Sequence, residues 1–160
     1  MVQATPSFQQ LIRNPVHFLA FGFGSGLSPK APGTAGTLVA LLLWPFLATL
    51  PLMLYVFIVV LAAVAGFYLC GKTASDLGVH DHQGIVWDEI AGFWLAMTAV
   101  PLAWPWMLAG FVLFRLFDIW KPWPIGWFDR QVGGGLGIML DDLIAGAFTW
   151  VLLFAAMRVL

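Results

Sequence analysis

The chain has 160 residues, of which 61% are hydrophobic and only 9% are charged, and its formal net charge is −1. Soluble domains carry about 25% charged residues, so this composition predicts an integral membrane protein. The near-neutral charge excludes a basic surface for nucleic acid, and the single cysteine, Cys70, excludes an internal disulfide. At this length we expect one all-α membrane domain, residues 1–160.

The N-terminal segment, residues 1–30, is predicted to lie on the membrane surface and to continue into a loop. Apolar residues at positions 8, 11 and 12 have helical spacing, but Pro15 interrupts the pattern. The polar start of the chain lacks a charged stretch followed by an apolar core, so we expect no cleavable signal peptide.

A Gly- and Pro-rich stretch, residues 21–37, predicts a shaped loop that ends where a helix begins. Gly33 or Thr34 is expected to cap that helix and to leave free N–H groups in its first turn. Such a helix start attracts phosphate, and Lys30 stands just before it. An ordinary capped membrane helix with tight glycine packing explains the same residues.

From Ala31 to Gly71 no residue is charged, which predicts a hairpin of two membrane helices. We place the helices near 35–49 and 52–70, with Pro51 in the first turn of the second. Residues 66–73 match the phosphate-loop pattern G-x-x-x-x-G-K-[ST]. That pattern holds phosphate only in a loop after a strand, so we reject it at the end of an apolar helix.

The first polar loop, residues 72–89, contains two groups of interest. His80, Asp81 and His82 resemble a transition-metal site, but adjacent residues rarely all point at one ion, which favours Asp81 alone as a metal or hydrogen-bonding ligand. Asp88 and Glu89 stand directly before an uncharged run, residues 90–114. Carboxylates at the edge of hydrocarbon are costly, so they indicate an active site or merely the point where a helix leaves the membrane.

The positive charges indicate how residues 90–114 cross the membrane. One helix kinked at Pro101 and Pro105 would divide the lysines and arginines between both sides. Two short helices, near 86–100 and 104–119, leave only Arg158 on the far side, which agrees with the positive-inside tendency. We therefore expect a small polytopic bundle of about five short membrane helices, with the N-terminus and the Gly/Pro-rich polar loops in the cytoplasm.

Two further charged groups follow. Arg115 and Asp118 share a helix face by their i,i+3 spacing, with Lys121 just before the helix stop at Pro122. They form either a structural ion pair or a site in which Asp118 binds a metal and the cations bind phosphate. The glycines of residues 133–137 predict a tight loop, after which Asp141 and Asp142 are expected to open the last helix, 143–157.

Carboxylates, lysine, arginine and glycine turns suit Mg²⁺ and the transfer of a phosphoryl group. Covalent alternatives are poorly supported, because no arginine lies within the six residues after Cys70 and no G-x-S-x-G serine motif is present. The residues alone therefore predict a Mg²⁺-type enzyme acting on a phosphate at the membrane surface.

Four motifs occur in order along most of the chain: GSGLSPKAPGTAGT at 24–37, Asp81 with IVWDEIAG at 85–92, FRLFDIWKPWP at 114–124 and GGLGIMLDD at 134–142. Together they resemble the phosphatidylglycerophosphatase A family. The resemblance implies a Mg²⁺-dependent, multi-pass phosphatase of the bacterial cytoplasmic (inner) membrane with a phospholipid substrate, phosphatidylglycerol phosphate. It implies functions for Asp81, Asp88, Glu89, Arg115, Asp118, Lys121, Asp141 and Asp142.

Our hypothesis divides the roles within this set. Glu89, Asp118, Asp142 and Asp81 hold Mg²⁺. The catalytic residues are Asp88, Glu89, Asp118 and Asp141. Among them, Asp88 or Asp141 acts as an acid or as the base that activates water. The phosphate is held by Lys121, Arg115, Lys30 and the helix start at Gly33 and Thr34.

Two alternatives remain from other classes of protein. A small ion or proton transporter would also keep carboxylates near its helices, but it should carry some of them in mid-membrane. A non-catalytic membrane assembly protein would not need clustered acids. The sequence does not set the oligomeric state.

Overall fold

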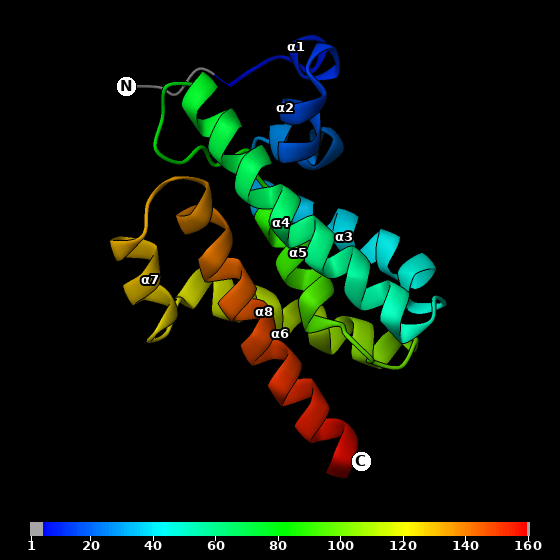
Figure 1. Ribbon diagram of the computed structural model, residues 1–160. Coiled ribbons are helices and arrows are strands. Elements are labelled where there is room, and N and C mark those ends of the chain that lie inside the picture. Colours follow the sequence, from blue (N-terminus) through cyan, green and yellow to red (C-terminus); the bar gives the residue numbers. More distant parts are fainter. Residues whose placement is uncertain (1–4, 160) are drawn as a thin grey trace.

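The structure is a computed structural model that describes residues 5–159, without the side chains of residues 128 and 129. Over this range the chain forms eight α-helices and one short 3₁₀ helix, and it contains no strand (Figure 1). The predicted all-α class is confirmed.

The N-terminal segment folds into α1 (Phe8–Arg13), α2 (Pro15–Ala20) and the 3₁₀ helix η1 (Gly22–Leu27). The chain breaks between α1 and α2 at Asn14, whose side chain accepts hydrogen bonds from the first N–H groups of α2. Pro15 thus interrupts the helix as predicted, and it starts the next one. His17 Nε2 lies 3.0 Å from Asp76 Oδ2, which joins α2 to the end of α4 (Leu52–Asp76).

The expected hairpin is formed by α3 (Pro32–Ala48) and α4. Its start was predicted wrongly: Ala31, in a left-handed conformation with φ 49°, is the N-cap, and no side chain caps the helix. Pro32 takes the first position, where its missing N–H costs nothing. The phosphate-loop pattern of residues 66–73 lies inside α4, so its rejection is confirmed.

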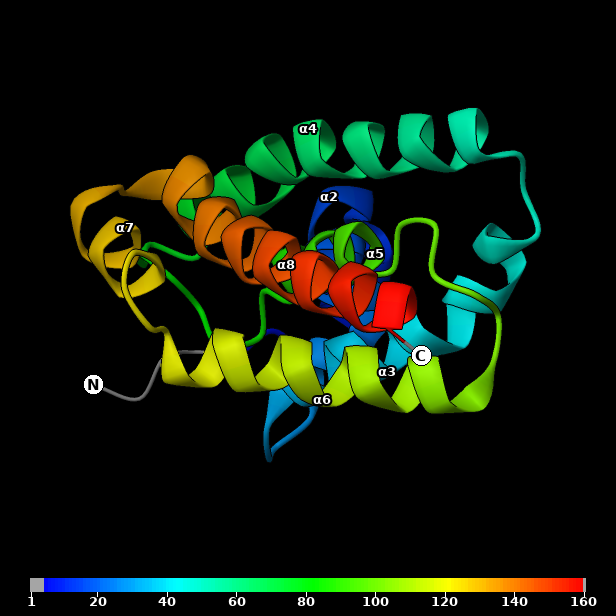
Figure 2. The same ribbon diagram turned by 90° about the horizontal axis from the view of Figure 1, so that it is seen from below.

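The next two helices are α5 (Trp87–Ala96) and α6 (Trp104–Trp120), joined by residues 97–103. This confirms the division into two helices over a single kinked one. Figure 2 shows α5 at the centre, with α4, α8 (Gly134–Val159), α3 and α6 around it. Ile90, Ala91 and Phe93 of α5 are fully buried, so this helix forms the core.

The last part of the chain differs most from the prediction. A short helix, α7 (Ile125–Gln131), was not predicted, and α8 begins at Gly134 instead of after the acid pair. Gly133 lies in the tight connection between α7 and α8, as predicted, but the glycines from Gly134 onward belong to α8. Gly135 allows α8 to pack closely on α4. A Cβ at Gly135 would collide with the Phe67 carbonyl oxygen and would lie 2.8 Å from the backbone nitrogen of Gly71.

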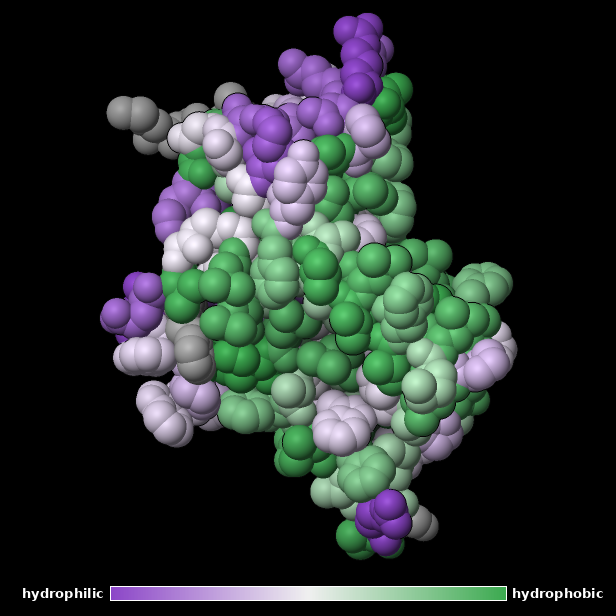
Figure 3. Space-filling view, viewed as in Figure 1, coloured by the Kyte–Doolittle hydropathy of each residue, from purple (hydrophilic) through white to green (hydrophobic). Residues whose placement is uncertain are grey.

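Two helices, α4 and α8, are long and apolar enough to cross a membrane, and α3 is a shorter apolar helix. Large apolar side chains are exposed on the bundle, including Phe46 and Phe57. Figure 3 shows a broad hydrophobic face over the helices, with hydrophilic residues gathered at one end and along one edge. These features are compatible with a membrane protein.

Candidate active site

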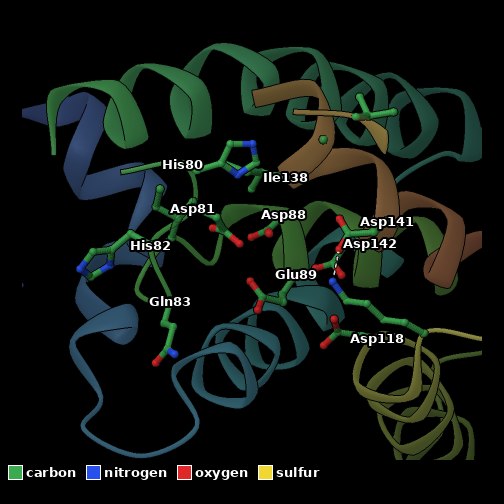
Figure 4. Close-up of a pocket in the computed structure, with 14 residues that line it drawn as sticks. His80, Asp81, His82, Gln83, Asp88, Glu89, Asp118, Ile138, Asp141 and Asp142 are labelled. Carbon is green, nitrogen blue, oxygen red and sulfur yellow. Dashed lines mark hydrogen bonds and ion pairs between the residues drawn. The ribbon is translucent and has the colours of Figure 1, made fainter. Parts of the chain in front are cut away.

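A cavity of about 170 Å³ lies where the first turn of α5, the end of α6 and the early part of α8 meet. All six acidic residues that the sequence singled out line it (Figure 4): Asp81, Asp88, Glu89, Asp118, Asp141 and Asp142. Lys121 lines the same cavity. The predicted gathering of the acids is confirmed, although they are separated by many residues in sequence.

Glycines between α5 and α8 bring these acids together. A Cβ on Gly92 would lie 2.6 Å from the Asp142 carbonyl oxygen, and a Cβ on Gly146 would collide with the Gly92 carbonyl oxygen. The two backbones are therefore in direct contact, which no larger residue permits. This contact places Asp142, one turn before Gly146, beside the first turn of α5.

Asp88, Glu89 and Asp142 form a compact group. One carboxylate oxygen from each lies within 4.8 Å of the others. Asp88 Oδ1, Glu89 Oε2 and Asp142 Oδ2 are buried and have no hydrogen-bond partner among the described residues. Buried oxygens without partners and three neighbouring negative charges are both unfavourable, and one divalent cation relieves both. The group therefore fits Mg²⁺, which prefers carboxylate oxygens.

This group shares Glu89 and Asp142 with the predicted ligand set of Glu89, Asp118, Asp142 and Asp81. Asp88, predicted as an acid or base, belongs to the three close carboxylates, whereas Asp118 and Asp81 line the cavity outside them. Asp142 also lies two turns inside α8, so the helix-start dipole does not account for it. A buried acid in the middle of a helix is a stronger indication of function than an acid at a helix start, where the sequence had placed Asp142.

Arg115 forms the ion pair with Asp118 that the i,i+3 spacing indicated. Its Nη1 lies 2.5 Å from Asp118 Oδ2 and 3.9 Å from Glu89 Oε1. The side chains of Arg115, Asp118 and Glu89 are each 12–14% exposed, so water screens these contacts little. Arg115 also donates to Thr37 Oγ1 at 3.4 Å.

Lys121 provides the positive charge inside the cavity. It ends α6 in a left-handed conformation with φ 44°, just before Pro122. A residue with a side chain rarely adopts this conformation, and such strain gathers at functional sites. Lys121 Nζ donates to Asp141 Oδ2 at 2.6 Å, so Asp141 holds the ammonium group at the cavity wall.

The loop before α5 contributes Asp81 but not a histidine metal site. In Figure 4 the Asp81 carboxylate points towards Asp88, while the His82 ring points away from the acids. The His82 ring packs 5.4 Å from the Phe21 ring, and its Nδ1 accepts from the Gly84 N–H. Burial lowers the pKa of His82 despite the neighbouring Asp81. His82 therefore stabilises the loop as a neutral side chain.

The predicted phosphate contacts at the start of α3 do not line the cavity. Lys30 is exposed in the loop before α3, and Thr34 is half-buried in the first turn. Gly33 lies against the acids from behind, because a Cβ there would collide with Glu89 Oε1 and lie 3.2 Å from Arg115 Nη1. Sequence reasoning missed Thr37, although its i,i+4 spacing from Gly33 places both on one helix face.

Comparisons with known proteins identify the family of the chain. The model of the family described as phosphatidylglycerophosphatase A matches residues 18–157. The chain belongs to the phosphatidylglycerophosphatase A family. This confirms the resemblance that the four motifs indicated, and the match covers every residue of the cavity.

Two relatives carry the name phosphatidylglycerophosphatase A. One from Escherichia coli (strain K12) is 54% identical over 142 residues, which are 88% of this chain and 83% of the relative. Another from Haemophilus influenzae is 45% identical over 157 residues, which are 97% of this chain and 96% of the relative. No solved structure matches the chain.

Proposed function

We propose that this protein is a phosphatidylglycerophosphatase. It hydrolyses the terminal phosphate monoester of phosphatidylglycerol phosphate to give phosphatidylglycerol and inorganic phosphate. The family and the names of the two relatives support this activity. The observation that carries it is the close group of Asp88, Glu89 and Asp142 in one cavity with Lys121.

The charge balance of the site supports a requirement for Mg²⁺. The acids of the cavity outnumber Lys121 and the nearby Arg115, so a phosphate monoester would meet net negative charge. Asp88, Glu89 and Asp142 would hold the ion, which when bound neutralises phosphoryl charge and activates water.

The chain's own residues then supply position and proton transfer. Lys121 donates to a non-bridging oxygen of the phosphate, while Asp141 fixes the ammonium group. Asp81, which faces the acids from a loop, accepts a proton from the attacking water. The water oxygen bonds to phosphorus, the ester P–O bond breaks, and the glycerol oxygen leaves and takes up a proton from solvent. Asp81 then releases its proton to solvent, which restores the site. Lys30 and the start of α3 contact the outer part of the headgroup.

Phosphate release from phosphatidylglycerol phosphate in detergent micelles tests this function. We expect release with Mg²⁺, loss of release with EDTA, and recovery when excess Mg²⁺ is added back. Release that survives EDTA would contradict the metal requirement and direct attention to a covalent nucleophile. The absence of release under all conditions would contradict the function and favour the transporter or the assembly protein.

We also propose that the bundle crosses the cytoplasmic membrane five times, through α3, α4, α5, α6 and α8, with the cavity towards the cytoplasm. The helix order supports this, because the loop that carries Asp81 and the parts of α5, α6 and α8 that carry the other acids of the cavity then lie towards the same side of the membrane. The short α5 has 10 residues and a length of about 15 Å, half the hydrocarbon thickness. Because it is buried among the other helices, it does not need to match that thickness.

Cysteine labelling in intact cells checks the five crossings. Single cysteines at the exposed positions Thr49 and Leu102, between α3 and α4 and between α5 and α6, are expected to react with a membrane-impermeant maleimide. A cysteine at exposed Ser75, near the cavity end of α4, should react only after the cells are lysed. The buried Cys70 serves as the unreactive background. Labelling at Ser75 before lysis would indicate the opposite orientation in the membrane. The absence of labelling at Leu102 would contradict the crossings by α5 and α6.

A further inference from the structure

A buried threonine stands behind the carboxylates of the site. Thr37 on α3 is fully buried, one turn after Gly33. Its hydroxyl donates to the Gly33 carbonyl oxygen at 2.9 Å, so its only proton is already used. The oxygen lone pairs are left for another donor, and Arg115 Nη1 lies 3.4 Å away. The hydroxyl is therefore oriented as an acceptor towards Arg115.

Arg115 Nη1 is shared among three helices. It reaches Asp118 on its own helix α6, Glu89 on α5 and Thr37 on α3. Arg115 is not among the described residues that line the cavity, although Glu89 and Asp118 are. The guanidinium group thus contacts the two carboxylates without lining the cavity itself.

Gly33 gives this arrangement its space. Any Cβ at Gly33 would occupy the position of Glu89 Oε1 and would press on Arg115 Nη1. Gly33 and Thr37 together form the wall against which Glu89 and Arg115 pack. The wall has one polar contact to Arg115, the Thr37 hydroxyl.

We propose that Thr37 is a positioning residue: it fixes the Arg115 guanidinium, which in turn orients Glu89 and Asp118 for a divalent cation. This inference rests on the proposed function for the identity of the reaction, but the orientation of the carboxylates does not depend on it. Arg115 then acts on the acids and not on the phosphate, which revises the role that the sequence suggested. Groups that orient metal ligands change metal affinity by about 10–100-fold.

The chain offers a matched control. Thr149 on α8 is fully buried, and its hydroxyl donates to the Ala145 carbonyl oxygen at 2.9 Å, the same backbone contact that Thr37 makes. Thr37→Val and Thr149→Val therefore remove the same intrahelical hydrogen bond from the same buried setting. Only Thr37→Val also removes the contact with Arg115. Thr37→Ser keeps the hydroxyl and serves as the conservative variant.

Mn²⁺ binding in detergent, measured by the spin resonance signal of the free ion, gives a readout without turnover. We expect Thr37→Val to weaken Mn²⁺ binding about tenfold. It should raise the Mg²⁺ concentration for half-maximal phosphate release by a similar factor and leave the KM for the lipid unchanged at saturating Mg²⁺. Thr37→Ser should stay within about twofold of the wild type, and Thr149→Val should match the wild type in both measurements.

Three outcomes would overturn the inference. If Thr37→Val and Thr149→Val show the same Mn²⁺ binding and the same Mg²⁺ dependence of phosphate release, Thr37 has a purely structural role. A raised KM with unchanged Mn²⁺ binding would place Arg115 on the substrate. Mn²⁺ binding weakened as much in Thr37→Ser as in Thr37→Val would exclude the hydroxyl as the cause. If the wild type releases no phosphate but Thr37→Val still binds Mn²⁺ more weakly than the wild type, the proposed function is refuted and the positioning role is kept.

Discussion

Replacing Asp142 with asparagine is expected to reduce phosphate release about a thousandfold while the protein remains folded. Such a loss corresponds to about 4 kcal/mol of transition-state stabilisation. The side chain is 2% exposed and belongs to the group that fits a cation, so the change removes one negative charge from that group. Asparagine has nearly the same shape, so the packing of α8 should survive.

The measurement is the initial rate of phosphate release in micelles over a range of Mg²⁺ concentrations, together with Mn²⁺ binding. Asp76→Asn is the control, because Asp76 pairs with His17 and Lys72 at the end of α4 and lies outside the cavity. That variant should keep a rate within about threefold of the wild type, since exposed ion pairs contribute little. If the rate of Asp142→Asn stays within tenfold of the wild type at equal Mg²⁺, Asp142 is not a ligand of the ion.

Replacing Gly146 with alanine is expected to destabilise the bundle and to impair the site together. The new Cβ would collide with the Gly92 carbonyl oxygen where α5 and α8 touch, so the two helices must separate. Overpacking of this kind costs about 1–3 kcal/mol, and here it would also move Asp142 away from Glu89. We expect a lower Tm in detergent and a loss of phosphate release that added Mg²⁺ restores only in part.

Ala155→Val provides the comparison for this change. Ala155 is exposed on the same helix, so an added pair of methyl groups meets no protein backbone there. Its Tm and activity should equal those of the wild type. If Gly146→Ala melts at the wild-type temperature, the close contact between α5 and α8 is not a determinant of stability.

The sequence predicted the helices well where charge and proline mark their ends. The uncharged run after Ala31 and the turn at Pro51 indicated the first hairpin, and the positive charges indicated the division between α5 and α6. The prediction failed around Gly133–Gly137, because glycine is permitted both in loops and where two helices touch. Whether such glycines form a loop or a helix contact depends on where α4 lies, and the position of α4 is set by the tertiary fold and not by the local sequence.

The sequence identified which acids belong to the candidate site but not how they are placed relative to one another. Every acid of the cavity was identified in the sequence: Asp81 in a polar loop, Asp118 by its spacing to Arg115, and the two acid pairs beside apolar runs. The close grouping of Asp88 with Asp142 depends on the α5–α8 contact, which no local pattern encodes. The contact between Thr37 and Arg115 was missed for the same reason, since an apolar helix does not indicate which of its faces meets a charge.

The shortness of α5 has a consequence for how the protein is made. A segment of 10 residues that begins with two acids is a weak signal for insertion into a membrane, and a helix of that length is marginal by itself. We therefore expect α5 to enter the bilayer as a hairpin with α6 and to become stable only when α8, which follows later in the chain, packs against it. Because α8 also carries Asp142, the nascent chain acquires its complete acid group only after α8 has left the ribosome.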